Sequence, residues 1–186
     1  MNGPDARQRL MDGNALFRKA VDPALLARLN TKAQEPFVAI LSCSDSRVDP
    51  NRIFNLSMGD AFVVRDVGNC ASDPFVLGSI EYAVEHLHVR MVLVLGHTGC
   101  GAIRAALDGK APDGLDKVMR EIERARDRIP ADRAKDVDAI AESNVRLQMR
   151  VIEDNSLPIA SAVNKGSLQM AGAMYDLATG SVRFIQ

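Results

Sequence analysis

The sequence predicts an α/β fold in which a central, mostly parallel β-sheet is flanked by helices and ends in an antiparallel C-terminal strand. Residues 37–42 and 90–96 are almost continuously apolar, which is typical of strands covered on both faces. Helical patterns alternate with these strands, as expected for a parallel sheet between layers of helices. Near the end of the chain, residues 168–175 and 181–185 flank Ala-Thr-Gly, which indicates a hairpin.

The first third of the chain is predicted to be mainly helical. Apolar side chains recur at roughly helical spacing between residues 10 and 29, with interruptions expected at Gly13 and Pro23. The strand at residues 37–42 follows, and a second short strand is predicted at residues 61–64. The next helix is predicted at residues 74–88, because the residue before it is an aspartate that can cap it and its first residue is a proline.

Three more helices are predicted after the strand at residues 90–96. One begins at residues 102–107, and two longer ones cover residues 115–128 and 133–153. The longer two are amphipathic, and their charges indicate a solvated face rather than a binding surface. No repeat or low-complexity linker interrupts the chain, so residues 1–186 are predicted to form a single domain.

The composition excludes several classes of protein. The chain has 23 basic and 24 acidic residues and a net charge of −1, so no basic surplus favours nucleic acid or anionic lipid. The longest strongly apolar run, residues 91–95, is too short to span a membrane, and the first residues lack the apolar core of a signal peptide. We therefore expect a cytoplasmic protein. Three cysteines are too few for a disulfide framework and favour a metal site or a reactive thiol.

Two polar segments each come directly after a predicted buried strand. They are Cys-Ser-Asp-Ser-Arg at 43–47 and His-Thr-Gly-Cys-Gly at 97–101. Because functional sites of open α/β sheets form at the carboxyl ends of strands, we expect the two segments to meet. Cys43, His97 and Cys100 offer two thiolates and an imidazole, a ligand set suited to zinc. Three protein ligands leave one position open, as a catalytic zinc requires.

Two neighbouring residues affect the fourth position of such a zinc. Asp45 could occupy it in a closed state, and Arg47 could hold the Asp45 carboxylate away in a charge-assisted pair. Two alternatives stay open on the residues alone. One is a structural zinc with Asp45 or Cys70 as the fourth ligand. The other is a Cys/His nucleophile pair, which would leave the other cysteine without a role.

The same residues resemble the signatures of the β-class carbonic anhydrases. The resemblance is carried by Cys-Ser-Asp-Ser-Arg at 43–47 and Gly-His-Thr-Gly-Cys-Gly at 96–101. Further similar segments stand at 59–65, 78–83 and 172–180. The resemblance implies a lyase, a carbonate dehydratase with one zinc per chain. Its reaction would be the reversible hydration of carbon dioxide to bicarbonate and a proton by zinc-bound hydroxide.

The resemblance also implies a role for each matching residue. Cys43, His97 and Cys100 would hold the zinc, and Asp45 and Arg47 would form a catalytic dyad beside it. The implied substrate-binding residues are Gln34, Phe62, Val67, Tyr82 and Gly101, the last through its backbone N–H. In this family Gln34, Phe62 and Tyr82 would come from a neighbouring subunit.

The resemblance therefore implies a homodimer, often paired into a homotetramer. Residues 1–35 would form an N-terminal helical arm that packs on the neighbouring subunit. The family scaffold also hosts hydrolases of carbonyl sulfide and carbon disulfide with the same zinc ligands, so this substrate alternative stays open. A structural-zinc or interaction module without catalysis is a further alternative, against which Asp45, Arg47 and Gln34 argue.

Overall fold

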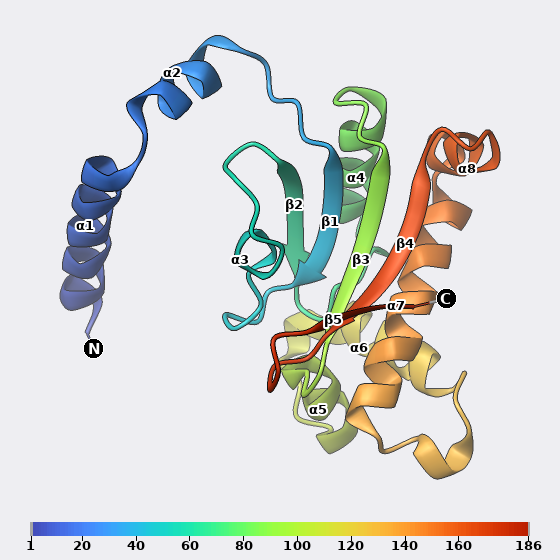
Figure 1. The fold of residues 1–186 in the computed structure, drawn as a ribbon. Helices are drawn as coiled ribbons and strands as arrows, with labels where there is room; N and C mark the ends of the chain where they lie inside the picture. Colours follow the sequence, from blue (N-terminus) through green and yellow to red (C-terminus); the bar gives the residue numbers. More distant parts are fainter. Residues whose placement is uncertain (1, 186) are drawn as a thin grey trace. The chain divides into compact units, whose positions relative to one another are not determined.

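The computed structural model describes residues 2–185, and the chain divides into two compact units between Gln34 and Glu35. The boundary lies next to the predicted end of the N-terminal arm. The first unit consists of α1 (Gly3–Ala20) and α2 (Pro23–Thr31) (Figure 1). The interruption expected at Gly13 is wrong, because α1 continues through it. A single glycine costs a helix only about 1 kcal/mol, whereas the break expected at Pro23 is present.

The second unit is built on a five-stranded sheet with the order β2-β1-β3-β4-β5. Its strands are β1 (Val38–Cys43), β2 (Ala61–Asp66), β3 (Met91–His97), β4 (Gln169–Tyr175) and β5 (Val182–Ile185). The first four pair in parallel, and β5 runs antiparallel to β4 at the edge (Figure 1). The predicted mostly parallel sheet and its antiparallel C-terminal strand are therefore confirmed.

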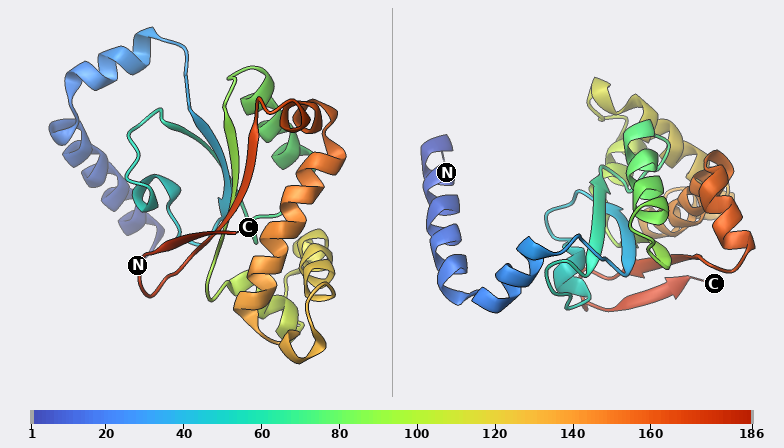
Figure 2. Two further views of the ribbon diagram at one scale, coloured as in Figure 1. Left: turned by 45° about the vertical axis from the view of Figure 1, so that its right-hand side comes forward. Right: turned by 90° about the horizontal axis from the view of Figure 1, so that it is seen from above.

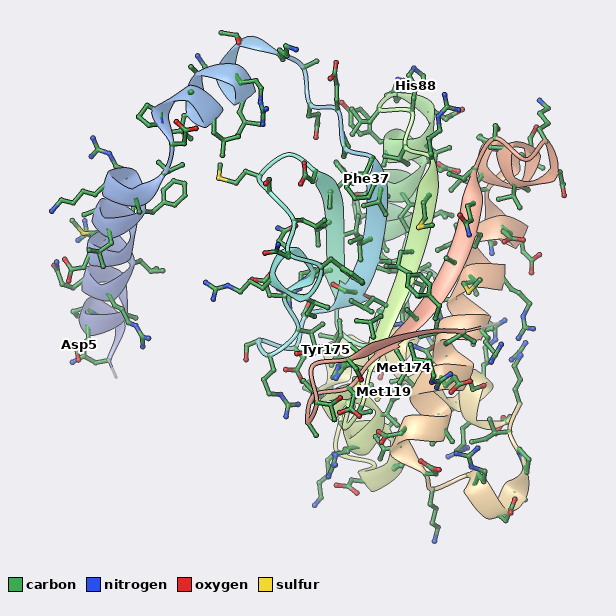
Figure 3. The ribbon with its side chains drawn as sticks, in the orientation of Figure 1. Asp5, Phe37, His88, Met119, Met174 and Tyr175 are labelled. Carbon is green, nitrogen blue, oxygen red and sulfur yellow. The ribbon has the colours of Figure 1, made fainter. Side chains whose placement is uncertain are left out.

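The two faces of the sheet support two separate hydrophobic cores. Leu41 and Val94 belong to the larger core, and Ile40 and Leu95 belong to the smaller one on the other face. The helices that cover the larger core lie together on one side of the sheet (Figure 2). The helices of the larger core are α4 (Pro74–Glu85), α5 (Gly101–Asp108), α6 (Asp116–Arg126), α7 (Val137–Asn155) and α8 (Leu157–Asn164). Successive residues near the end of β4, Met174 and Tyr175, likewise contribute to opposite cores (Figure 3).

Local capping residues explain where several helices begin. Asp73 caps α4 as predicted, since its side chain accepts a hydrogen bond from the Phe75 N–H. Helix α7 begins later than residue 133, because Asp136 caps it and a short 3₁₀ turn (Ala131–Arg133) precedes it. The sequence analysis missed α8 and the short α3 (Pro50–Ile53), although each follows a capping residue and has a proline in its first turn.

Helix α7 packs very close to the centre of the sheet, where two strands carry glycine. A Cβ atom added at Gly96 would lie 2.6 Å from a Val145 methyl carbon, and one at Gly172 would lie 2.7 Å from the Met149 sulfur. This close approach places α7 beside the carboxyl end of β3.

Within residues 2–185, no helix combines the length and apolar character that a membrane span requires.

Candidate metal centre

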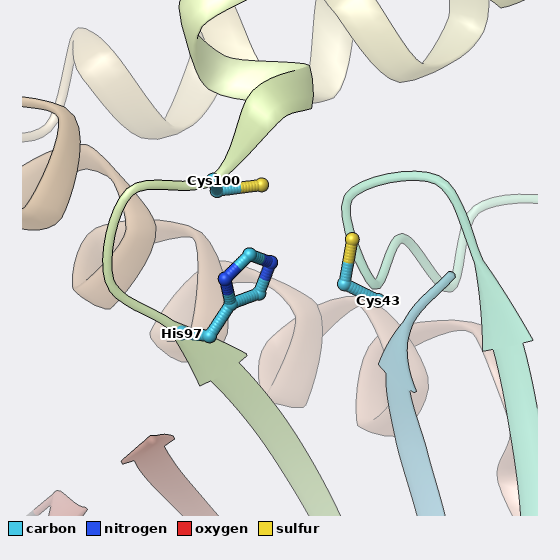
Figure 4. Close-up of side chains that lie close together, drawn as sticks. All are labelled: Cys43, His97 and Cys100. Carbon is cyan, nitrogen blue, oxygen red and sulfur yellow. The ribbon is translucent and has the colours of Figure 1, made fainter. Parts of the chain in front are cut away.

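Two thiols and an imidazole converge at the carboxyl edge of the sheet. Cys43 is the last residue of β1, His97 is the last residue of β3, and Cys100 is the N-cap of α5. Because β1 and β3 are parallel neighbours, their ends lie together. The three candidate ligand atoms lie within 4.8 Å of one another, and all three residues are buried. Figure 4 shows the three side chains facing a common point.

The hydrogen bonds of His97 fit a metal ligand. Its Nδ1 lies 2.9 Å from the Thr98 carbonyl oxygen, which can only accept, so Nδ1 donates and, in the neutral imidazole, Nε2 carries the lone pair. The Nε2 atom is buried and has no hydrogen-bond partner in the structure. Leaving a buried polar atom unpaired costs about 1–3 kcal/mol, and a metal ion at this point would remove that cost. The two thiols beside it complete a donor set that suits zinc.

The surroundings of Cys43 favour its thiolate form. The pKa of Cys43 is lowered to about 4, mainly by the hydrogen bond from the Cys100 thiol, although burial acts in the opposite direction. The Gly68 N–H also donates to the Cys43 sulfur at 3.4 Å. The pKa of Cys100 is raised by the same interaction and by burial. The surroundings therefore favour a thiolate in this pair of thiols, and metal binding requires the thiolate form.

Asp45 and Arg47 form a bidentate ion pair beside the cluster. Arg47 Nε donates to Asp45 Oδ1 at 2.9 Å, and Nη2 donates to Oδ2 at 2.7 Å. The Arg47 backbone N–H also donates to Oδ1, at 3.0 Å. The side-chain hydrogen bond from Arg47 holds the pKa of the Asp45 carboxyl well below its usual range. Asp45 is thus an ion at any pH near neutrality, and both of its oxygens are engaged by Arg47.

Arg65 is a residue of this site that the sequence analysis missed. It lies on β2, and its guanidinium donates two hydrogen bonds to the Cys43 carbonyl, at 3.1 and 3.0 Å. A third hydrogen bond, of 2.8 Å, reaches the Asp45 carbonyl. Arg65 is the last residue of the similar segment 59–65, but it was given no role, because a single arginine in a strand carries no spacing signal.

The predicted substrate-binding residues lie on several elements. Phe62 on β2 and Tyr82 on α4 are in ring contact, with centroids 6.1 Å apart. Val67 directly follows β2 and packs against the larger core. Gly101 is the first residue of α5, with no atom within 4 Å of the position of a Cβ. Gln34 is exposed and is the last residue of the first unit.

The fold and the donor set together define an α/β protein with a candidate zinc centre at the carboxyl edge of its sheet. The carbonic anhydrase family model matches residues 38–182. A carbonic anhydrase of Mycolicibacterium smegmatis is 36% identical over 95% of this chain and 90% of its own length. Carbonic anhydrase 2 of Mycobacterium tuberculosis is 38% identical over 79% of this chain and 73% of its own length.

Solved structures agree with the sequence relatives. The β-carbonic anhydrase CafA of Aspergillus fumigatus superposes with a TM-score of 0.83 at 29% identity, covering 98% of this chain and 90% of that one. A tetrameric β-carbonic anhydrase of Sordaria macrospora superposes with a TM-score of 0.84 at 28% identity, covering 98% of this chain and 97% of that one. This chain belongs to the β-class of the carbonic anhydrase family, and its enzyme class is that of the carbonate dehydratases, which are lyases.

Proposed function

We propose that this chain is a zinc-dependent enzyme that reversibly hydrates carbon dioxide to bicarbonate and a proton. Cys43, His97 and Cys100 would hold one zinc ion. The observation that carries the proposal is the buried, unpartnered His97 Nε2 facing two thiols, in a chain of the carbonic anhydrase family. When bound in such a site, zinc lowers the pKa of a water molecule to near 7 and so supplies hydroxide at neutral pH.

Asp45 and Arg47 would work together beside the metal. The ionised Asp45 carboxylate can accept a hydrogen bond from the attacking water and orient it toward the substrate carbon. Arg47 keeps this carboxylate charged and, through two hydrogen bonds, holds it in place. The same contacts keep Asp45 from becoming a fourth metal ligand, so the pair would hold the open position free for water.

The remaining site residues suit a small neutral substrate. Carbon dioxide is apolar, so Phe62, Val67 and Tyr82 can form its pocket without a charged partner. As the reaction proceeds, negative charge develops on the oxygens of the substrate. The Gly101 N–H, at the N-terminus of α5, and the Gln34 amide could donate hydrogen bonds to those oxygens.

We further propose that the active enzyme is a homo-oligomer. No residue of α1 or α2 is buried, and apolar side chains there, such as Leu10 and Leu16, are 75% and 67% exposed. Such residues would gain from burial against a second copy of the chain. The related Sordaria macrospora protein is tetrameric. In this arrangement Gln34, Phe62 and Tyr82 would complete the site of a neighbouring subunit. A cytoplasmic location remains a prediction of the sequence.

The proposal is tested by stopped-flow hydration of carbon dioxide by the zinc-loaded protein, near neutral pH and above pH 8, with the zinc content measured. We expect one zinc per chain and fast hydration at both pH values. Activity only at the higher pH would mean that Asp45 closes the site near neutrality. Bound zinc without hydration at either pH would overturn the proposal, and hydrolysis of carbonyl sulfide would then identify the alternative enzyme.

A further inference from the structure

A buried polar network lies on the helix side of the candidate metal centre. Three polar side chains of α6 and α7 form it, and all are buried. They are Glu121, Asn144 and Gln148, of which the last two are 1% and 0% exposed. Helices α6 and α7 already pack through apolar residues such as Ile122 and Ile140. Polar groups are therefore not required to hold these helices together, and burying them is costly unless each is paired.

The two amides of this network hold the loop that follows β2. Asn144 Nδ2 donates to the Gly68 carbonyl at 2.8 Å, and the Ala71 N–H donates to Gln148 Oε1 at 2.8 Å. Loop 67–71 is therefore pinned near both of its ends by neighbouring turns of α7. Both contacts are long-range: the first joins two residues that are 76 positions apart in the chain, and the second joins two that are 77 positions apart.

Further hydrogen bonds fix the direction of each amide. Gln148 Nε2 donates to Asn144 Oδ1 at 3.1 Å and to Glu121 Oε2 at 3.2 Å. The other Glu121 oxygen accepts from Arg124 at 2.6 Å. Because the Gln148 nitrogen is occupied by two acceptors, its oxygen must face the loop. The carboxylate of Glu121 thus sets the orientation of both amides.

One residue of the loop, Gly68, connects these amides to the metal centre. Gly68 receives the Asn144 amide on its carbonyl, and its own N–H donates to the Cys43 sulfur at 3.4 Å. Gly68 has a φ of +80°, a conformation that glycine adopts without strain. An N–H donor aimed at a thiolate orients the sulfur and withdraws negative charge from it, as outer hydrogen bonds do at metal sites.

We propose that Asn144 and Gln148 are positioning residues of the metal centre, which hold loop 67–71 so that the Gly68 N–H stays aimed at the Cys43 sulfur. This inference rests on the proposed zinc site of Cys43, His97 and Cys100. The two amides touch neither substrate nor metal. They act through the loop on one ligand, and that ligand's orientation and electron density depend on them.

The test compares two nearly isosteric variants, Asn144→Leu and Gln148→Met, with Ser143→Ala as the matched control. Ser143 is buried on the same helix, and its hydroxyl donates to the Ala125 carbonyl on α6, not to the loop. Zinc affinity is measured by competition with a chelator. The thiolate-to-metal charge-transfer absorption is recorded after Co²⁺ is loaded, and thermal unfolding is followed for all three variants.

We expect Asn144→Leu and Gln148→Met to weaken zinc binding by about 10- to 100-fold and to shift the charge-transfer band. Ser143→Ala should lower the melting temperature while leaving the zinc affinity and the band unchanged. If all three variants lose thermal stability but keep the wild-type affinity and band, the network is only structural and the inference is wrong. If Asn144→Leu does not fold, Asn144→Ser, which leaves room for water, replaces it in the same comparison.

Measurements on the wild-type protein distinguish failure of this inference from failure of the proposed function. Zinc binding and a thiolate band in the wild type, together with unchanged values in the folded variants, would overturn the positioning role alone. A wild-type protein that binds neither zinc nor Co²⁺ through thiolates would overturn the proposed metal site and, with it, this inference.

Discussion

The two halves of the candidate metal centre are built in different ways. The end of β3 and the turn after it supply two ligands, His97 and Cys100, which are separated by two residues and brought together by a tight turn with Gly99 at φ +62°. The end of β1 supplies only Cys43. Its carbonyl is held by Arg65 and its sulfur by Gly68, both more than twenty residues away.

Long-range hydrogen bonds also anchor the turn, and they fall on Thr98 and Gly99, between the two ligands. The Leu177 N–H donates to the Thr98 hydroxyl at 3.0 Å, and the Gly99 N–H donates to Asp138 at 2.7 Å. In the other half, the long-range contacts fall on the ligand residue itself. A change in those distant residues should therefore act directly on Cys43, whereas losing the hydrogen bonds to Thr98 or Gly99 would act on His97 and Cys100 through the turn.

The largest effect expected is the loss of zinc, and it should be equal in the two halves. Cys43→Ser and Cys100→Ser each remove one of the three proposed ligands, so both should abolish zinc binding and carbon dioxide hydration together. The measurements are zinc content by atomic absorption and stopped-flow hydration. A variant that retains full zinc and full turnover would remove its cysteine from the ligand set.

The next effect is a loss of activity that leaves metal binding intact. Asp45→Ala leaves all three proposed ligands in place, so we expect full zinc content and a hydration rate lowered by about 100-fold, a typical loss for a group that handles protons. Arg47→Ala should also lower the rate, mostly near neutral pH, because it frees the carboxylate to compete with water for the metal. Undiminished turnover of Asp45→Ala would exclude this residue from the mechanism.

Removing a long-range contact from the Cys43 half should have a smaller effect, which is a loss of folding stability. Arg65→Met deletes three hydrogen bonds to the Cys43 and Asp45 carbonyls, and because Arg65 is exposed we expect a loss of only about 1–2 kcal/mol in the free energy of unfolding. The control is Arg52→Met, which removes a surface ion pair to Asp49 and should change stability by less than about 1 kcal/mol. Urea unfolding compares the two, and equal losses would show that Arg65 does not support the loop.

A pH-dependent effect is expected at the end of β2, next to the Cys43 half. Burial raises the pKa of Asp66 to about 7. In the unfolded chain its pKa is about 4, so the folded state binds the extra proton and stability falls as pH rises from about 4 to 7. In the metal-free protein, Asp66→Asn should therefore be more stable than the wild type by up to about 4 kcal/mol at pH 8 and gain little at pH 4. Parallel curves of unfolding free energy against pH would contradict this.

Much of the fold could be predicted because its elements carry local signals. The buried runs of β1 and β3 are apolar throughout, and Asp73 with Pro74 marks the start of α4. Helix boundaries were less predictable, since the end of a helix depends on capping and packing. Gly13 shows the limit of a local rule, because one glycine does not interrupt a helix whose other residues favour it.

The sequence by itself determined the donor set of the candidate site. Cys43, His97 and Cys100 follow buried strands, and parallel strands bring their carboxyl ends to one edge of a sheet, so the chemistry could be inferred from residue type and spacing. Only the tertiary structure decided which groups surround the ligands. Arg65 and Gly68 reach Cys43 from distant parts of the chain, and the amides of α7 hold the loop that carries Gly68. Such contacts depend on how helices and loops pack, which no spacing along the chain records.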